Sequence, residues 1–237
     1  FLSKLRSCFD TLKLIKKKKN DQKNLIGFCG SPLTVLTYMI EGQTSKNHLK
    51  TKQLIRNNKK NIDKLIEILV DYSITYLDEQ IKAGAEIIQL FESWASIVNQ
   101  TDFDKYVIDP NKEIVQRIKK IHPEIPIICF PRNNPEKLSD FIKNVDCDVL
   151  SVDLKIPEEV KSFCSRRNIA IQGNLDPKIL MRGGSLLSQK INETLMQFKK
   201  NKHIFNLSHG ILPETPISHV EKTIKQIRQY DKTRISS

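Results

Sequence analysis

The chain of 237 residues carries 39 lysines and arginines against 27 aspartates and glutamates, a net charge of +12, and 39% of its residues are hydrophobic. Aliphatic runs recur along the whole length, which is typical of a globular protein with a sizeable core rather than a disordered chain. No apolar run reaches the roughly 18 residues that a membrane-spanning helix needs, and we expect a single domain over residues 1–237.

The amino-terminal residues do not predict a signal peptide, because charges such as Lys4, Arg6 and Asp10 interrupt any apolar stretch. The densest basic run, Lys16–Lys19, is expected at a helix end or in a loop. Nucleic-acid binding is the alternative, but no interleaved aromatic residues and no nucleic-acid motif accompany the run. The positive charge also suits a small polyanionic substrate. We therefore expect neither a nucleic acid nor a membrane as partner.

Six short apolar runs alternate along the chain with longer amphipathic segments. Nearly continuous runs of five to seven residues are typical of strands buried on both faces of a parallel sheet. The predicted strands are Asn24–Gly30, Glu86–Phe91, Ile125–Phe130, Asp148–Val152, Ile169–Gly173 and His203–Leu207.

The segments between these runs predict helices. Residues from Pro32 open one, Lys50–Ile81 is long enough for two, and five further segments suit one each: Asn111–Ile121, Lys137–Lys143, Glu158–Arg166, Leu186–Lys200 and Ser218–Tyr230. Strands alternating with helices predict an α/β fold. Six strand–helix units are two short of a (β/α)8 barrel, and the glycine fingerprints of open nucleotide-binding sheets are absent. We expect a barrel-type domain with about six of its eight units in this chain.

In parallel α/β folds the functional site lies at the carboxyl ends of the strands. Polar residues follow each predicted strand: Gly30-Ser31, Glu92-Ser93, Pro131-Arg132, Asp153, Asn174–Asp176 and Ser208–Gly210. Asp176 before Pro177 is typical of a helix N-cap.

Three of the polar side chains are candidates for ligand binding. Tyr38 is either a core tyrosine or a phenol that points into a pocket. Ser93 has no nucleophile-elbow motif, so we expect a hydrogen-bonding hydroxyl rather than a nucleophile. His209 lies before Gly210 beyond the last strand, where a structural and a functional role are equally open.

The five cysteines are odd in number and include no C-x-x-C pair. We expect free, mostly buried thiols in a reducing cytosol rather than disulfides. The spacing of histidine and cysteine ligands for a zinc site is absent. We therefore assign no metal ligand and expect no cofactor.

Four ordered segments resemble uroporphyrinogen decarboxylase. They are LIGFCGSPLTVLTYMIEG (Leu25–Gly42), GAEIIQLFESWA (Gly84–Ala95), IQGNLDP (Ile171–Pro177) and HIFNLSHGILPETP (His203–Pro216). The order and spacing follow the carboxyl-terminal two-thirds of that family.

The resemblance implies a (β/α)8 barrel that acts as a cytosolic, cofactor-free homodimer in haem biosynthesis. Such a carboxy-lyase removes carbon dioxide from the four acetate side chains of uroporphyrinogen to give coproporphyrinogen. By the same resemblance, Tyr38, Ser93 and His209 bind the substrate. The pocket-wall positions that the resemblance implies are Phe28, Gly30 and Phe91.

Some family motifs differ or do not occur. The arginine-rich segment R-Q-A-G-R and the aspartate of F-S-D-I have no counterpart in the chain, so we assign it no catalytic residue and expect residues 1–237 alone to be inactive. Ser208 stands where the family has glycine. Two alternatives stay open: a corrinoid or thiol methyltransferase of similar barrel architecture, and a non-enzymatic remnant of a split gene.

Overall fold

The computed structural model describes residues 1–43, 45–153 and 155–235. It divides into two compact units, Phe1–Val149 and Leu150–Ser237. Each unit is described by itself. The single domain over residues 1–237 stays a prediction.

All six predicted strands are present. Each lies within two residues of the apolar run that predicts it. They are β1 (Ile26–Gly30), β2 (Ile87–Glu92), β3 (Ile127–Pro131), β4 (Val149–Ser151), β5 (Ala170–Leu175) and β6 (His203–Leu207).

The predicted helices are also confirmed, with small shifts at their ends. The first unit contains η1 (Leu2–Leu5), α1 (Arg6–Lys18), α2 (Pro32–Glu41), α3 (Leu49–Asn57), α4 (Lys59–Lys82), η2 (Ala95–Ile97), α5 (Gln100–Phe103), η3 (Asp104–Ile108), α6 (Asp109–Ile121), η4 (Pro135–Lys137) and α7 (Leu138–Asn144). Of these, α2, α3, α4, α6 and α7 correspond to predicted helices, and the others were not predicted. The second unit contains α8 (Glu158–Arg166), α9 (Pro177–Arg182), α10 (Gly184–Gln197) and α11 (Ile217–Ile235).

The strands are parallel, and each lies beside its neighbour in the chain. The order is β1-β2-β3 in the first unit and β4-β5-β6 in the second. Gly30 of β1 is in register with Phe91 of β2, which is in register with Phe130 of β3. A doubly wound sheet reverses its strand order at a switch point, whereas a barrel does not. The fold is therefore α/β of the (β/α)8 type, with six βα units in this chain.

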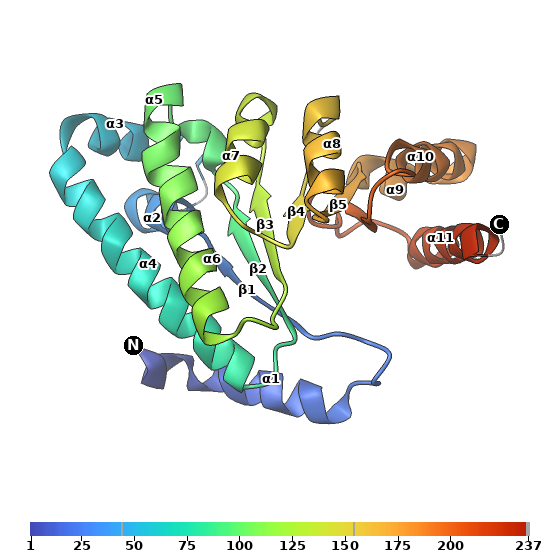
Figure 1. The fold of residues 1–237 in the computed structure, drawn as a ribbon, viewed down its shortest axis with the longest axis horizontal. Coiled ribbons are helices and arrows are strands. Elements are labelled where there is room, and N and C mark those ends of the chain that lie inside the picture. Colours follow the sequence, from blue (N-terminus) through green and yellow to red (C-terminus); the bar gives the residue numbers. More distant parts are fainter. Residues whose placement is uncertain (44, 154, 236–237) are drawn as a thin grey trace. The chain divides into compact units, whose positions relative to one another are not determined.

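In the first unit, α4 and α6 lie side by side against the strands (Figure 1). Alternate residues of β2, Ile88 and Leu90, are fully buried, as are Ile114 and Ile118 of α6. The apolar stripe of each helix therefore packs on one face of the strands. Burial on this face alone leaves β1 buried only at Gly27 and Cys29, whereas β3 is buried at all five of its positions.

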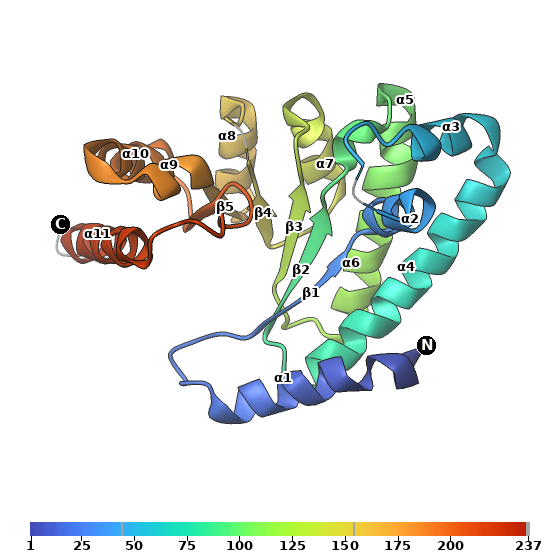
Figure 2. The ribbon, with the colours of Figure 1, turned by 180° about the vertical axis from the view of Figure 1, so that it is seen from behind.

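Helix α1 lies near the amino ends of β1 and β2 (Figure 2). Its last turn carries the basic run that begins at Lys16, which confirms the expected helix end. The amino groups of Lys16 and Lys19 lie 2.6 and 3.2 Å from the carboxylate of Glu86. Two of the four lysines are therefore used in holding α1 against the start of β2.

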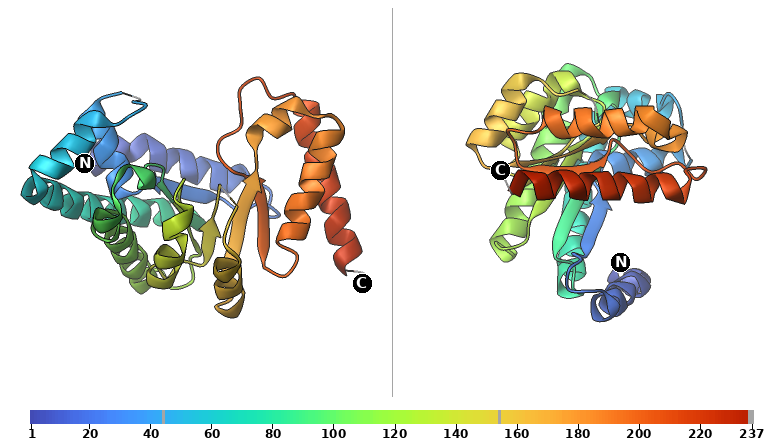
Figure 3. Two further views of the ribbon diagram at one scale, coloured as in Figure 1. Left: turned by 90° about the horizontal axis from the view of Figure 1, so that it is seen from above. Right: turned by 90° about the vertical axis from the view of Figure 1, so that its right-hand side faces the viewer.

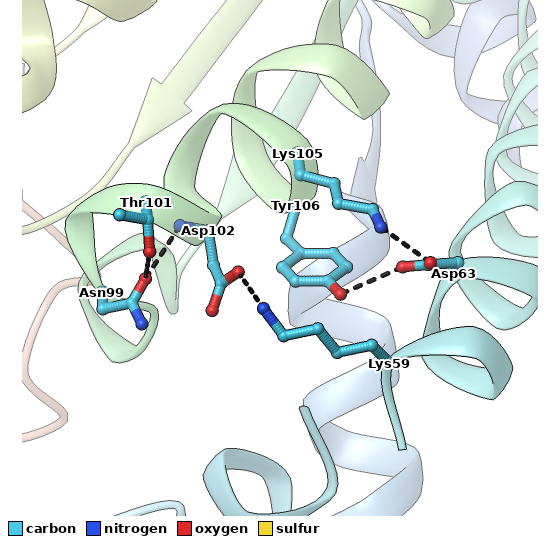
Figure 4. A network of polar contacts seen from close by, with 7 residues as sticks. All are labelled: Lys59, Asp63, Asn99, Thr101, Asp102, Lys105 and Tyr106. Carbon is cyan, nitrogen blue, oxygen red and sulfur yellow. Dashed lines mark hydrogen bonds and ion pairs between the residues drawn. The ribbon is translucent and has the colours of Figure 1, made fainter. Parts of the chain in front are cut away.

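A polar network ties the segment before α6 to α4 (Figure 4). Asp63 of α4 accepts a hydrogen bond from the hydroxyl of Tyr106 at 3.0 Å and pairs with Lys105 at 2.7 Å. Lys59 pairs with Asp102 at 2.9 Å. The network fixes η3 directly before α6 and so places the first turn of α6 beneath the carboxyl end of β2.

In the second unit, α10 and α11 pack side by side (Figure 3). The N-cap predicted at Asp176 is confirmed, because its carboxylate accepts the backbone N–H of Lys178 at 2.8 Å. The core of this unit contains Leu175, Leu180, Leu187, Ile191 and Leu195, against which Phe205 and Leu207 of β6 and Val220 and Ile227 of α11 pack.

Candidate active site

The predicted pocket-wall residues lie together on the first unit. Gly30 and Phe91 are direct neighbours across β1 and β2. The rings of Phe28 and Phe91 meet edge to face, with centroids 5.8 Å apart. Phe28 is 59% exposed, and with Gly30 it lines an apolar groove of about 470 Å³. These side chains form an apolar wall that leads to the carboxyl ends of the two strands.

Tyr38 lies in α2, the helix that follows β1. It is 48% exposed, so the alternative of a core tyrosine is wrong. Its ring lies edge-on to Trp94, with centroids 6.0 Å apart. One side of the ring is therefore supported, while the side chain stays open to solvent.

Ser93 directly follows β2 and is half-buried. The next residue, Trp94, contacts both Tyr38 and His48, whose ring centroid lies 4.2 Å away. His48 is 5% exposed, and burial lowers its pKa below the usual value of 6.5. A neutral imidazole thus packs on one side of Trp94 and the candidate tyrosine on another.

A buried polar network lies between the candidate residues and the helices. The hydroxyl of Thr34 in α2 donates to Oε1 of Glu92, the last residue of β2. The hydroxyl of Ser31 donates to Oδ1 of Asn111 in α6 at 2.8 Å. All four side chains are at most 4% exposed. The network joins α2, the end of β2 and the first turn of α6.

The carboxyl group of Glu92 is unusual within this network. Burial raises its pKa to about 8, although hydrogen bonds, first of all the one from Thr34, act in the opposite direction. At neutral pH the protonated form therefore predominates. A neutral carboxyl group needs no cation beside it, and among the described residues no lysine or arginine pairs with Glu92.

His209 lies in the second unit, beyond the end of β6, and is half-buried. Its Nδ1 atom lies 3.2 Å from the carbonyl oxygen of Gly210, the next residue. The base of this loop is held by Ser208, whose N–H donates to the carbonyl of Leu175 at 2.8 Å. Serine at position 208 therefore keeps a backbone hydrogen bond to β5 directly before His209.

The structure brings Phe28, Gly30, Tyr38, Phe91 and Ser93 together at one end of the first unit, and places His209 at the corresponding strand end of the second. No sequence motif marked His48, which reaches Trp94 from the connection between α2 and α3. The position of Glu92 at a strand end was evident from the sequence. The burial of its carboxyl group was not.

Among the residues that the structure describes, no three histidine, cysteine or acidic side chains gather in a way that could hold a metal ion. The five cysteines are free, and all but Cys8 are buried, as predicted. No described helix is long and apolar enough to cross a membrane.

Known proteins of two kinds are similar to this chain. The family model described as uroporphyrinogen decarboxylase (URO-D) matches residues 1–230. Proteins named uroporphyrinogen decarboxylase from Rickettsia bellii and Rickettsia rickettsii are 40% and 36% identical, over 96% and 99% of this chain. The chain spans 67% of the length of each of these relatives.

Solved structures of methyltransferase type share the fold. A methyltransferase from Methanosarcina mazei superposes with a TM-score of 0.73 at 17% identity, over 94% of this chain and 63% of the other. A B12-independent methionine synthase from Shewanella gives 0.61 at 11% identity, over 95% and 67%. At such low identity these structures support the α/β fold alone. The match over residues 1–230 and the Rickettsia relatives show that the chain belongs to the uroporphyrinogen decarboxylase family, a family of carboxy-lyases.

Proposed function

We propose that the protein, in its natural full-length form, decarboxylates the acetate side chains of uroporphyrinogen to give coproporphyrinogen. Family membership and the location of the candidate residues support this proposal. The observation that carries it is the cluster of Tyr38, Ser93 and the Phe28–Phe91 wall at the carboxyl ends of β1 and β2. The ends of parallel strands are where such folds bind their ligands.

The chemistry explains what these side chains would do. Loss of carbon dioxide from an acetate on a pyrrole needs an electron sink, which protonation of the ring provides. Phe28 and Phe91 offer an apolar wall for the tetrapyrrole. The hydroxyl groups of Tyr38 and Ser93 and the imidazole of His209 are hydrogen-bond donors suited to its carboxylates.

We infer that the anionic partner is this small substrate rather than a nucleic acid. A net charge of +12 attracts a polyanionic tetrapyrrole. Two of the four lysines in the densest basic run, Lys16 and Lys19, are already engaged with Glu86. A homodimer in the cytoplasm that needs no cofactor completes the proposal; sedimentation of the purified protein tests the dimer.

Tyr38→Phe tests the phenol apart from the ring. Phenylalanine keeps the contact with Trp94, so the midpoint of thermal unfolding should not change. The value of kcat/KM should fall about tenfold, because a hydrogen bond to a charged group contributes about 1.5 kcal/mol. An unchanged kcat/KM would remove Tyr38 from the site.

Tyr106→Phe is the matched control. The hydroxyl of Tyr106 donates to Asp63 at 3.0 Å in the network of Figure 4, and the side chain is 1% exposed. This variant should lower the unfolding midpoint and leave kcat/KM of the folded enzyme unchanged, which is the opposite pattern to that of Tyr38→Phe.

A further inference from the structure

Glu92 carries a fully buried carboxyl group and lies between two candidate residues in the chain. It follows Phe91 and precedes Ser93, and its side chain is 0% exposed. Because side chains alternate along a strand, Glu92 points to the helix side while Phe91 faces the wall. A buried carboxyl group without a cation is costly unless it is neutral and hydrogen-bonded.

The contacts of Glu92 connect the two segments that carry the candidate residues. Its Oε1 atom accepts from the hydroxyl of Thr34, and Tyr38 lies one helical turn further along α2. Directly before α2, the N–H of Ser31 donates to the carbonyl of Phe91 at 2.9 Å. Two consecutive residues of β2 therefore hold the first turn of α2.

We propose that Glu92 is a positioning residue of the decarboxylase site: its buried carboxyl group fixes α2 against the end of β2 and so sets the position of Tyr38 relative to Ser93. The inference rests on the proposed function. Glu92 faces away from the wall and acts through Thr34 and the backbone, not by touching the substrate.

The protonation state of Glu92 gives this role a pH dependence. Its pKa of about 8 means that the group is neutral at pH 7 and becomes a buried anion above pH 8. The groups that face it are the Thr34 hydroxyl of α2, Asn111 of α6 and the N–H of Trp94, none of which ionises. From β1 it is faced by the thiol of Cys29, whose pKa burial raises to about 12. No cation among these neighbours offsets the new charge, so the contact with α2 should loosen.

The raised pKa of Glu92 also makes the free energy of unfolding depend on pH. Below about pH 4.5 the carboxyl group is protonated in both the folded and the unfolded chain, and it contributes no pH dependence. Between about pH 4.5 and 8 only the folded chain keeps the proton. The unfolding equilibrium constant of the native protein should therefore rise about tenfold per pH unit in this window, relative to a variant with glutamine.

The decisive experiment compares the full-length protein with Glu92→Gln from pH 6.5 to 9. Glutamine is neutral and keeps an acceptor for Thr34, so it mimics the protonated group. We expect kcat/KM of the native enzyme to fall with an apparent pKa near 8, and that of Glu92→Gln to stay within about threefold of the native value at pH 7 without this alkaline loss. The same alkaline loss in Glu92→Gln would overturn the proposal.

Thr34→Val tests the other partner of the hydrogen bond. Valine keeps the shape and removes the hydroxyl donor, so kcat/KM should fall about fivefold, the effect of one neutral hydrogen bond. Thr34→Ser should restore it. Unchanged kinetics in a folded Thr34→Val enzyme would contradict the positioning role.

Glu86→Gln is the matched control for Glu92→Gln, because Glu86 lies beside the other end of β2 and its pKa is lowered to about 2 by Lys16.

Fluorescence of Trp94, the only tryptophan of residues 1–237, separates this inference from the proposed function. It follows Glu92 by two residues and contacts Tyr38. The fluorescence should titrate near pH 8 in the native protein and not in Glu92→Gln, whether or not uroporphyrinogen is turned over. His48 lies against Trp94 but titrates below pH 6.5. A native signal that is constant from pH 7 to 9 would overturn the inference even if the enzyme is active.

Discussion

Replacing Gly173 with alanine is expected to destabilise the second unit by roughly 3 kcal/mol or more. Gly173 has a φ of +134° in β5, a backbone conformation that costs a residue with a side chain about 1–3 kcal/mol. An added Cβ would also lie 2.4 Å from the carbonyl oxygen of Val152. The backbone of Val152 cannot move away from the added Cβ without losing a hydrogen bond, because its N–H donates to the carbonyl oxygen of Gln172 at 2.9 Å. The loss is a large part of a typical stability of about 5–15 kcal/mol.

Urea unfolding followed by circular dichroism measures this effect. Gly184→Ala is the control, because Gly184 also has a positive φ, +70°, but no atom lies within 4 Å of an added Cβ. We expect it to cost about 1–2 kcal/mol from the backbone conformation alone. Equal midpoints for the Gly173→Ala and native proteins would show that the close approach of β5 to Val152 does not exist in solution.

His209→Ala is expected to lower kcat/KM of the full-length enzyme by about 10- to 100-fold. The loss of a hydrogen bond to a charged group costs about 1.5–3 kcal/mol. The contacts of the loop explain why the free energy of unfolding should change little. The ring nitrogen Nδ1 of His209 lies within hydrogen-bond distance of the carbonyl oxygen of the adjacent Gly210, and Ser208 rather than His209 ties the loop to β5. The unfolding free energy should change by no more than about 0.5 kcal/mol.

His219→Ala gives the contrasting result in the same unit. The ring of His219 packs against Gly183, and its Nδ1 lies 3.0 Å from the carbonyl oxygen of Leu180. This variant should lose stability and keep kcat/KM in its folded fraction. If His209→Ala is as active as the native enzyme, His209 does not bind the substrate.

The sequence predicted the six strands from their apolar runs, although the structure buries them unequally: β3 is buried at all five positions, β1 only at Gly27 and Cys29, and β6 at none. The helix that starts at Pro177 was signalled by its N-cap, whereas the π-helical turn η3 before α6 was not. That turn is set by the contacts of Asp63 with Lys105 and Tyr106, which lie more than 40 positions away along the chain.

The candidate residues were predictable in part, because polar residues after buried strands mark the carboxyl ends of a parallel fold. Which way each side chain points was not. Tyr38 could have been core, and only its exposure decides otherwise. Glu92 reads from the sequence as one more polar residue at a strand end, and its neutral carboxyl group results from complete burial, against which the hydrogen bonds of Thr34 and Asn111 act.

The most direct measurement is the product analysis of the full-length protein incubated with uroporphyrinogen in the absence of oxygen. Chromatography of the oxidised products should show stepwise loss of the acetate carboxyl groups, ending at coproporphyrinogen, and a much slower reaction for His209→Ala. Unchanged uroporphyrinogen with a native protein shown by circular dichroism to be folded would contradict the decarboxylase function.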